Sequence, residues 1–254
     1  MKRGRLHNLV LGFALLLATS LPGFAEKPTW AKKSRAFPSE CRERSDFAKC
    51  RPLRIPSPDG KSVVAVSYLE KGDLREAFLR VATSDGRVRE TAPPWGFQDL
   101  DLLWSPDSRA FFLNGGNGGG YWGFFVYVFR LDDPKLEPVD VTQEARGDML
   151  RLFPPCKAAG IEQTTCKQIE ADPQDLNRSG IDWVRDSSAI AVMVEVPCSG
   201  THGGIMCQVM GYELEVPTGR ILKRMDARQL KMRWQSSMAF KLSIPDPPRY
   251  ADTK

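Results

Sequence analysis

Six cysteines fall into three close pairs, and their spacing predicts the covalent chemistry of the chain. The pairs are Cys41 with Cys50, Cys156 with Cys166, and Cys198 with Cys207, separated by nine, ten and nine positions. Because short loops close at the lowest entropic cost, we expect one disulfide within each pair. Each typically contributes about 2–4 kcal/mol to stability. Metal binding is the alternative, but the chain has no C-x-x-C sequence and only two histidines.

The segment from Cys198 to Cys207 is the first candidate site. It reads Cys-Ser-Gly-Thr-His-Gly-Gly-Ile-Met-Cys, and a disulfide across its base would limit its motion. His202 could act as a base or contact a ligand, together with its neighbour Thr201. The alternative interpretation is a solvated loop histidine with no role in binding.

A glycine-rich segment from Asn114 to Trp122 is the second candidate. Its glycines would let a ligand approach the backbone closely near Asn117, and Tyr121 and Trp122 would offer stacking surfaces. The segment is not a phosphate-binding loop, because it does not follow a strand and open a helix. The alternative is a hairpin loop whose aromatic residues pack inward.

A third candidate follows the spacing of a calcium loop. Its oxygen donors are Asp175, Asn177, Ser179 and Asp186. Alternating donors followed by a glycine match the start of such a loop, but the twelfth position is usually a glutamate that binds through both oxygens. The alternative is a capped turn that leads into a strand ending at Trp183. Calcium is the only cofactor that this pattern suggests.

Three similar stretches indicate the elements that must position these residues. They are Ile55–Val66, Trp104–Leu113 and Trp183–Val192. Each contains the end of a strand, a polar turn with an aspartate, and an apolar strand. Further β-branched and aromatic runs follow each copy and are separated by Gly, Pro and Asp. Each unit is therefore predicted to be a four-stranded antiparallel meander, the shape of a propeller blade.

The spacing of the three units predicts where other elements lie. Asp107 stands 48 positions after Asp59, whereas Asp186 stands 79 positions after Asp107, so an insert separates the second and third units. We expect a short helix near Gln143–Phe153 in this insert, with Ala145, Met149, Leu152 and Phe153 on one side. The second unit should end in a strand over Leu136–Val141. A fourth blade could combine Met238–Ile244, which alternates like a half-buried strand, with Thr29–Phe37.

The turn Trp104-Ser-Pro-Asp107, followed by an apolar strand, resembles the repeat of TolB-like propellers, which are relatives of WD-repeat blades. The resemblance covers about 53–92, 99–142 and 180–226. It implies an all-β, propeller-like fold and contact with other proteins, although fold analogy is weak evidence for function. The third copy departs from the pattern, with Val184 and Arg185 in place of Ser-Pro. A β-sandwich with coincidental turns is the alternative fold.

Residues 1–25 are predicted to be a cleaved signal peptide, which places the mature protein in the periplasm or outside the cell. Three basic residues precede an apolar run over 9–17, and Gly23 and Ala25 suit signal peptidase. A membrane anchor is the alternative, but the run is shorter than the ~20 residues that a spanning helix needs. Removing those three charges from the formal +5 leaves 5 − 3 = +2. This charge gives no support to binding of nucleic acid.

The predicted domains are an N-terminal extension with one disulfide (26–52), a repeat domain (53–234) with an insert at 143–179, and a C-terminal strand and tail (235–254). In a four-stranded blade, the loops between second and third strands share a face with the connections between blades. That face would gather Glu70–Glu76, Asn114–Gly120, the loop Cys198–Cys207 and the insert. Loops on a rigid scaffold commonly have functional roles.

The sequence favours a non-catalytic binding module that contacts a protein, a peptide or a cell-wall component of the envelope. It contains no G-x-S-x-G, H-E-x-x-H or Walker sequence. One alternative is an envelope hydrolase that uses acidic residues or His202 on the loop face. A second is a structural accessory protein of an envelope assembly, in which an unpaired blade edge would form a homodimer.

Overall fold

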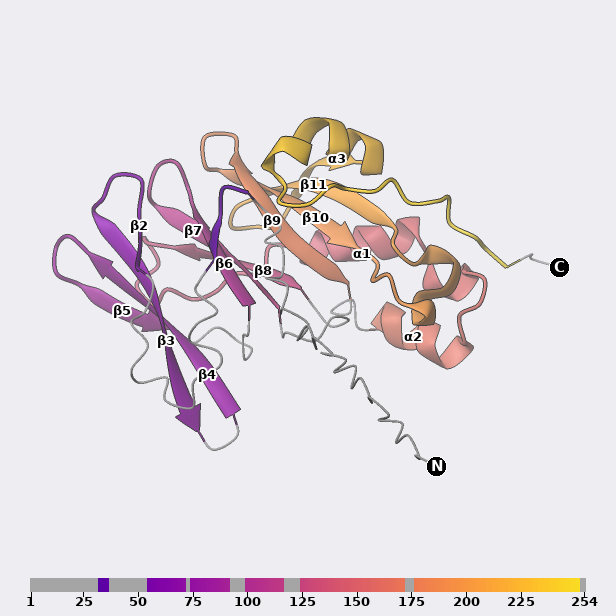
Figure 1. The fold of residues 1–254 in the computed structure, drawn as a ribbon, viewed down its shortest axis with the longest axis horizontal. Helices are drawn as coiled ribbons and strands as arrows, with labels where there is room; N and C mark the ends of the chain where they lie inside the picture. Colours follow the sequence, from indigo (N-terminus) through magenta and orange to yellow (C-terminus); the bar gives the residue numbers. More distant parts are fainter. Residues whose placement is uncertain are drawn as a thin grey trace, which may run out of the picture.

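The computed structural model describes residues 32–36, 54–71, 74–91, 99–116, 124–171 and 176–251. Their strands form three antiparallel sheets of four strands each, which follow one another across the molecule (Figure 1). The prediction of a mostly β protein is therefore confirmed. The predicted signal peptide and most of the predicted N-terminal extension lie outside the described residues.

Two of the sheets are meanders in which consecutive strands pair. The first contains β2 (Arg54–Pro56), β3 (Ser62–Lys71), β4 (Leu74–Thr83) and β5 (Val88–Thr91). The third contains β9 (Asn177–Val184), β10 (Ala189–Glu195), β11 (Val209–Glu215) and β12 (Ile221–Met225). Each of these two predicted repeat units is thus one sheet.

The second sheet has a different order because the N-terminal segment joins it. It contains β6 (Asp99–Trp104), β7 (Ala110–Gly116) and β8 (Phe125–Arg130), with β1 (Arg35–Ala36) on the outer edge of β6. Arg35 and Ala36 pair with Leu102 and Asp101. The neighbouring Lys33 forms an ion pair with Asp182 of β9, with Nζ and Oδ2 at 2.7 Å.

The strand predicted over Leu136–Val141 is reduced to one bridge between Val139 and Val128. The reason is the turn before it. Asp133 accepts backbone N–H groups from Lys135 at 3.0 Å and Glu137 at 2.7 Å. Leu136 also has a left-handed backbone, with φ of 54°, which no regular strand contains. The turn therefore extends to Glu137 and leaves only Val139 to pair.

The turns that open β3 and β7 share one hydrogen-bond pattern. The Ser57 hydroxyl donates to Asp59 Oδ1 at 2.7 Å, and the Ser105 hydroxyl donates to Asp107 Oδ1 at 2.6 Å. Each serine oxygen also accepts a backbone N–H from the residue five positions later, Ser62 or Ala110. The hydrogen bond from Ser57 lowers the pKa of Asp59.

These turns also contact one another from sheet to sheet. The residue after each aspartate has a positive φ, 71° at Gly60, 63° at Ser108 and 71° at Ser187. This conformation lets the serine hydroxyls reach the preceding turn. Ser108 Oγ accepts the Asp59 N–H at 3.1 Å, and Ser187 Oγ accepts the Asp107 N–H at 3.4 Å. The repeat in the sequence is thus a repeat in the contacts between sheets.

Two tryptophans connect the sheets in the same way. The Trp104 indole N–H donates to the Ile55 carbonyl at 3.1 Å, and the Trp183 indole N–H donates to the Leu103 carbonyl at 3.1 Å. Each tryptophan ends, or nearly ends, the first strand of its repeat. Each therefore reaches back to the equivalent strand of the preceding repeat.

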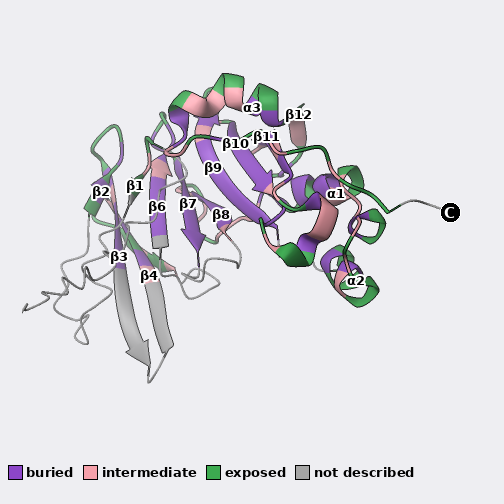
Figure 2. Cartoon of the chain, turned by 45° about the vertical axis from the view of Figure 1, so that its right-hand side comes forward, coloured by how far each residue is buried: buried purple, intermediate pink, exposed green. Residues whose placement is uncertain are grey.

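Apolar side chains fill the spaces between the sheets and beneath the helices. One cluster lies between the first and second sheets and includes Leu79, Phe111 and Phe129. Another lies between the second and third sheets and includes Phe112, Trp183 and Tyr212. Almost the whole length of β9 and β10 is buried (Figure 2). Gly180 of β9 is required here, because a Cβ atom would lie 2.8 Å from the Phe112 ring.

Helices occupy the insert and the C-terminal region. The predicted insert helix is confirmed as α1 (Gln143–Leu152), with Ala145 and Met149 buried. Leu152, however, is 44% exposed and does not belong to the buried side. Two further helices, α2 (Gln163–Ala171) and α3 (Ala227–Trp234), are not predicted from the sequence. None of the described helices is long and apolar enough to cross a membrane.

The prediction of a strand over Met238–Ile244 is wrong. This segment follows a short 3₁₀ helix (Gln235–Ser237) and is irregular. The Gln235 side chain replaces a strand partner: its Nε2 donates to the Phe240 carbonyl at 2.6 Å and its Oε1 accepts the Leu242 N–H at 2.9 Å. Met238 and Leu242 pack beneath α3 against the third sheet.

The predicted pairing of the two chain ends is replaced by a single contact. The Lys32 N–H donates to the Ser237 carbonyl at 2.7 Å, while β1 pairs with β6 instead. Lys32 and Ser237 therefore contact each other without forming a fourth sheet among the described residues.

Candidate functional site

Two of the three predicted disulfides are present. Cys156 is bonded to Cys166 and Cys198 to Cys207, with Cα–Cα distances of 4.9 and 4.4 Å. Both bridges belong to the side of the molecule on which β10 ends and the insert enters β9. The predicted Cys41–Cys50 bridge lies outside the described residues.

The loop between Cys198 and Cys207 is a short 3₁₀ segment on the end of a β-hairpin. The segment covers Gly200–Ile205 and has a kink at Gly203, where φ is 48°. The ladder of β10 and β11 continues to the base of the loop. The Val196 N–H donates to the Gln208 carbonyl at 2.8 Å, and the Cys207 N–H donates to the Val196 carbonyl at 3.0 Å. Hydrogen bonds and a disulfide thus close the same loop.

Three segments far apart in the sequence meet at this loop through their backbones. The Gly204 N–H donates to the Ala159 carbonyl at 2.7 Å, the Ala159 N–H donates to the Arg249 carbonyl at 2.9 Å, and the Arg249 N–H donates to the Gly204 carbonyl at 2.8 Å. The three bonds form a closed triangle. We call the surface formed by residues 157–161, 198–207 and 246–251 the disulfide face.

The glycines of the loop permit this close approach. A Cβ atom on Gly203 would lie 2.4 Å from the Ala159 carbonyl oxygen, and one on Gly204 would lie 2.0 Å from the Arg249 carbonyl oxygen. Gly200 differs, because a Cβ atom there would have no neighbour within 4 Å. Two glycines are therefore needed for packing, and the third faces open space.

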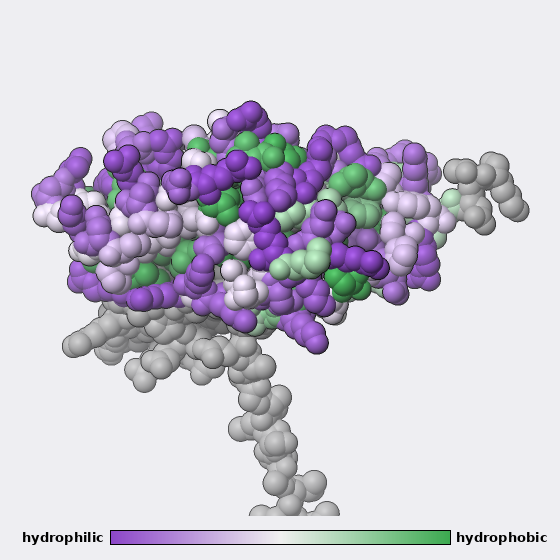
Figure 3. All heavy atoms as spheres, turned by 90° about the horizontal axis from the view of Figure 1, so that it is seen from above, coloured by the Kyte–Doolittle hydropathy of each residue, from purple (hydrophilic) through white to green (hydrophobic). Residues whose placement is uncertain are grey.

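An open hollow of about 350 Å³ lies on the disulfide face. Its lining is formed by Ala159, Gly160, Gly200, Gly203, Gly204, Met206 and Arg249. Met206, which lines the hollow, is 38% exposed. Such exposed apolar residues are few on the face that Figure 3 shows from above, where hydrophilic residues cover most of the described surface and hydrophobic residues form small separate areas. Met206 and Arg249 are the two residues of this lining with long side chains, and both are exposed.

The insert is fixed to the third sheet by a buried carboxylate. Asp148 of α1 accepts two hydrogen bonds from Arg224 of β12, at 2.6 and 2.7 Å, and lies 3.3 Å from the Tyr212 hydroxyl. Burial alone would raise the pKa of Asp148, but Arg224 and Arg151 outweigh it and lower the pKa. A charged hydrogen-bond pair of this geometry holds two elements in one orientation.

His202 and Thr201 occupy the loop differently from the prediction. Thr201 is exposed, whereas His202 is buried and turned into the structure. The His202 Nδ1 atom lies 3.2 Å from the Thr201 hydroxyl oxygen. The buried imidazole does not present itself to the hollow, whose lining it does not join.

The glycine-rich segment and the predicted calcium loop are the other two candidate sites, and the structure describes only part of them. Asn117, Tyr121 and Trp122 lie outside the described residues, as does Asp175. Asn177 and Ser179 are buried in the extended strand β9, and Asp186 belongs to the turn beyond its other end. At about 3.3 Å per residue, a strand separates Asn177 from Asp186 by more than 20 Å. Asn177 and Asp186 are therefore too far apart to bind the same ion.

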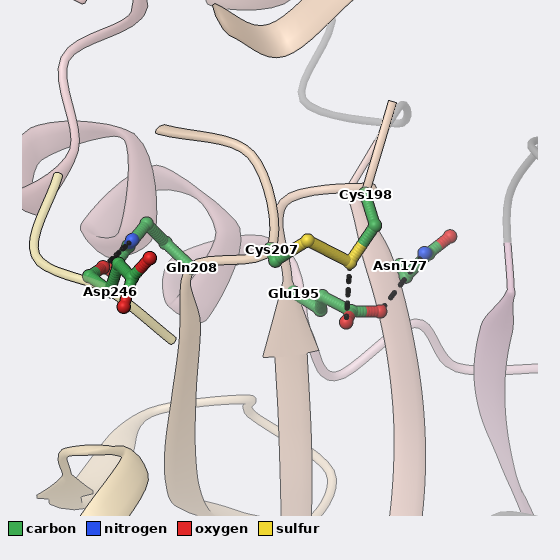
Figure 4. Close-up of a disulfide and its surroundings, with 6 residues drawn as sticks. All are labelled: Asn177, Glu195, Cys198, Cys207, Gln208 and Asp246. Atoms are coloured by element: carbon green, nitrogen blue, oxygen red, sulfur yellow. Dashed lines mark hydrogen bonds between the residues drawn. A yellow bond between two sulfur atoms is a disulfide. The ribbon is translucent and has the colours of Figure 1, made fainter. Parts of the chain in front are cut away.

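Figure 4 shows a carboxyl group beside the Cys198–Cys207 bridge. Glu195, the last residue of β10, places Oε1 3.7 Å from Cys198 Sγ. The Asn177 side-chain N–H donates to Glu195 Oε2 at 3.2 Å. Burial raises the pKa of Glu195 despite this hydrogen bond. Sequence reasoning missed Glu195, although a carboxylate three positions before a cysteine was the available signal.

A second buried carboxyl group lies where β1 meets β6. Asp101 accepts a hydrogen bond from the Ser34 hydroxyl at 2.5 Å and bonds to the Asn114 side chain. Burial raises its pKa to about 6, against these two hydrogen bonds. Asn114 also pairs with the Gly180 backbone, accepting its N–H at 2.7 Å and donating to its carbonyl at 2.9 Å. This cluster joins β1 to the second and third sheets.

Comparison with known proteins gives no family for the chain. No protein-family model and no curated protein matches it. Within the described ranges, no group of three or more His, Cys, Asp or Glu side chains is arranged to hold a metal ion.

Proposed function

We propose that this chain is an exported binding module that holds a protein or peptide on the disulfide face. The observation that supports this most is the closed triangle of backbone hydrogen bonds among Ala159, Gly204 and Arg249. A surface whose segments are fixed before binding loses little conformational entropy when a partner arrives. The two disulfides add to this rigidity by closing the insert and the loop.

The partner's chemistry follows from the hollow. Arg249 supplies a permanent positive charge, and the partly exposed Met206 supplies an adaptable apolar contact. A peptide segment with a carboxylate next to an apolar side chain would complement both groups.

The proposed scaffold is a partial propeller. The repeated contacts of Trp104 and Trp183, and of Ser108 and Ser187, support equivalent placement of successive sheets. Export rests on the N-terminal segment and on the disulfides, which persist in oxidising compartments.

A bulky substitution in the hollow tests this function. Gly200→Trp adds a side chain where a Cβ atom meets no neighbour, so it should fill the hollow and leave the fold intact. Ser84→Trp is the matched control, because Ser84 is exposed in the turn between β4 and β5, at the opposite end of the meanders.

The measurement is quantitative capture from an envelope extract by immobilised residues 26–254. A partner held by wild type and by Ser84→Trp, and reduced at least about tenfold by Gly200→Trp, supports the proposal; tenfold corresponds to ~1.4 kcal/mol. Equal capture by both tryptophan variants would place the binding surface elsewhere.

A further inference from the structure

We propose that the Cys198–Cys207 bridge is a thiol–disulfide exchange site in which Glu195 transfers the proton of the Cys198 sulfur. The co-reactant would be a dithiol, either a small molecule or the reduced form of a dithiol protein. This inference does not depend on the binding partner proposed above, because it concerns the loop's own covalent bond.

The geometry supplies the groups that such exchange needs. Cys198 is exposed and Cys207 is half-buried, so an external thiolate can reach the bridge. The Glu195 carboxyl oxygen lies 3.7 Å from Cys198 Sγ, close enough to give a proton to the sulfur or take one from it with a small movement. A carboxyl group at this distance can act as a general acid or base, because the first requirement for proton transfer is that the two groups lie close together.

The backbone around Glu195 holds it in this position. Glu195 pairs with Asn177 of β9 and with Val209 of β11. Asn177 binds the other carboxyl oxygen at 3.2 Å, so Oε1 is directed to the sulfur (Figure 4). The described neighbours on both strands are a neutral amide and an aliphatic side chain, and neither titrates.

Cys207 has the left-handed backbone conformation, with φ of 61°. Non-glycine residues rarely adopt this conformation and usually do so at some cost in free energy. In the Cys156–Cys166 bridge, Cys156 is exposed but Cys166 is buried, and the Cys166 sulfur lies 3.2 Å from the Gln163 carbonyl oxygen.

The exchange step balances as follows. A reductant thiolate attacks Cys207 Sγ, a new S–S bond forms, and the Cys198–Cys207 bond breaks with its electron pair on Cys198 Sγ. The protonated Glu195 carboxyl gives its proton to that thiolate. The reductant's second thiolate then displaces Cys207, so the dithiol is oxidised to a disulfide and the two cysteines are reduced. In the reverse direction, the Glu195 carboxylate removes the Cys198 proton.

Native-state reduction by dithiothreitol tests this proposal. The mature chain and the isosteric variant Glu195→Gln would be exposed to the reductant from pH 5 to pH 8, alkylated, and mapped by mass spectrometry. The Cys156–Cys166 bridge of the same molecule, with its buried Cys166, is the internal reference. Ionisation of the reductant cancels in the ratio of wild-type to variant rates at each pH.

We expect the Cys198–Cys207 bridge to open at least about tenfold faster than the Cys156–Cys166 bridge. The ratio of the wild-type to the Glu195→Gln opening rate should exceed one at low pH, where Glu195 is protonated. It should fall about tenfold as Glu195 ionises, because an interaction worth one pKa unit changes a rate by that factor. Two results overturn the proposal: both bridges opening at the same rate, which means that Glu195 gives the Cys198–Cys207 bridge no advantage, and a rate ratio that does not change with pH.

Discussion

Replacing Gly204 with alanine would test whether the C-terminal segment is truly part of the disulfide face. The new methyl group would lie 2.0 Å from the Arg249 carbonyl oxygen and 2.9 Å from its carbonyl carbon. Both are backbone atoms, so no side-chain rotation relieves the overlap. The two segments must move apart.

The cost follows from the bonds that this movement breaks. Separating Gly204 from Arg249 removes the hydrogen bond from the Arg249 N–H at 2.8 Å and strains the one that Ala159 donates to Arg249 at 2.9 Å. Two such bonds contribute about 2 kcal/mol together. For a chain of this size, 2 kcal/mol corresponds to a fall of about 4–8 °C in Tm. Gly200→Ala in the same loop should change stability by less than about 0.5 kcal/mol, because its Cβ atom meets no neighbour.

Urea unfolding of both variants would measure the difference, and hydrogen exchange would locate it. Gly204→Ala should speed exchange of the Arg249 and Ala251 amides, which donate to Gly204 and Lys157. If Gly204→Ala is as stable as Gly200→Ala and the tail amides stay protected, the backbone triangle does not exist as described.

Two further predictions concern the interior. Trp104→Phe keeps the aromatic ring but removes the N–H donor to the buried Ile55 carbonyl, and should lower the free energy of unfolding by about 1–3 kcal/mol in urea titration; an unchanged midpoint would show that the indole bond does not link the sheets. Asp101 has a folded-state pKa raised from 3.8 to about 6, so the folded state binds the proton more tightly than the unfolded state. Stability should therefore fall as pH rises from about 4 to 6, by at most about 3 kcal/mol. Asp101→Asn should flatten that part of the profile, and an identical profile in both proteins would contradict the assignment.

The sequence predicts those parts of the fold that local chemistry determines. The turns at Asp59 and Asp107 are recognisable because each is stabilised within a few residues by a serine and an aspartate. The pairs Cys156–Cys166 and Cys198–Cys207 are also local, since each bridge closes a short loop. Helix α1 follows from the periodicity of Ala145 and Met149.

Other parts depend on distant contacts and could not be predicted in this way. The alternation over Met238–Ile244 suggests a strand, but Gln235 satisfies its backbone and a helix covers it. For α3 a local signal was present and was overlooked: Asp226 and Gln229 form a reciprocal capping box. Pairing of β1 with β6 has no local signal, because it joins residues 35–36 to residues 101–102.

The candidate site likewise has features that the sequence reveals and features that depend on distant contacts. The loop Cys198–Cys207 is identifiable from composition, but its glycines suggest open space, whereas Gly203 and Gly204 are closely packed. His202 is conspicuous in the sequence and buried in the structure. Glu195 is one of many acidic residues in the sequence, and it is distinguished by its place at the hairpin end, where Oε1 lies beside the Cys198 sulfur.

Hydrogen exchange on residues 26–254, with and without a partner captured by them, would test whether the disulfide face binds that partner. We expect slower exchange at residues 157–161, 198–207 and 246–251 when the partner is bound, and no change at the turns around Asp59 and Asp107. Protection confined to those turns, with the disulfide face unaffected, would show that the partner binds elsewhere.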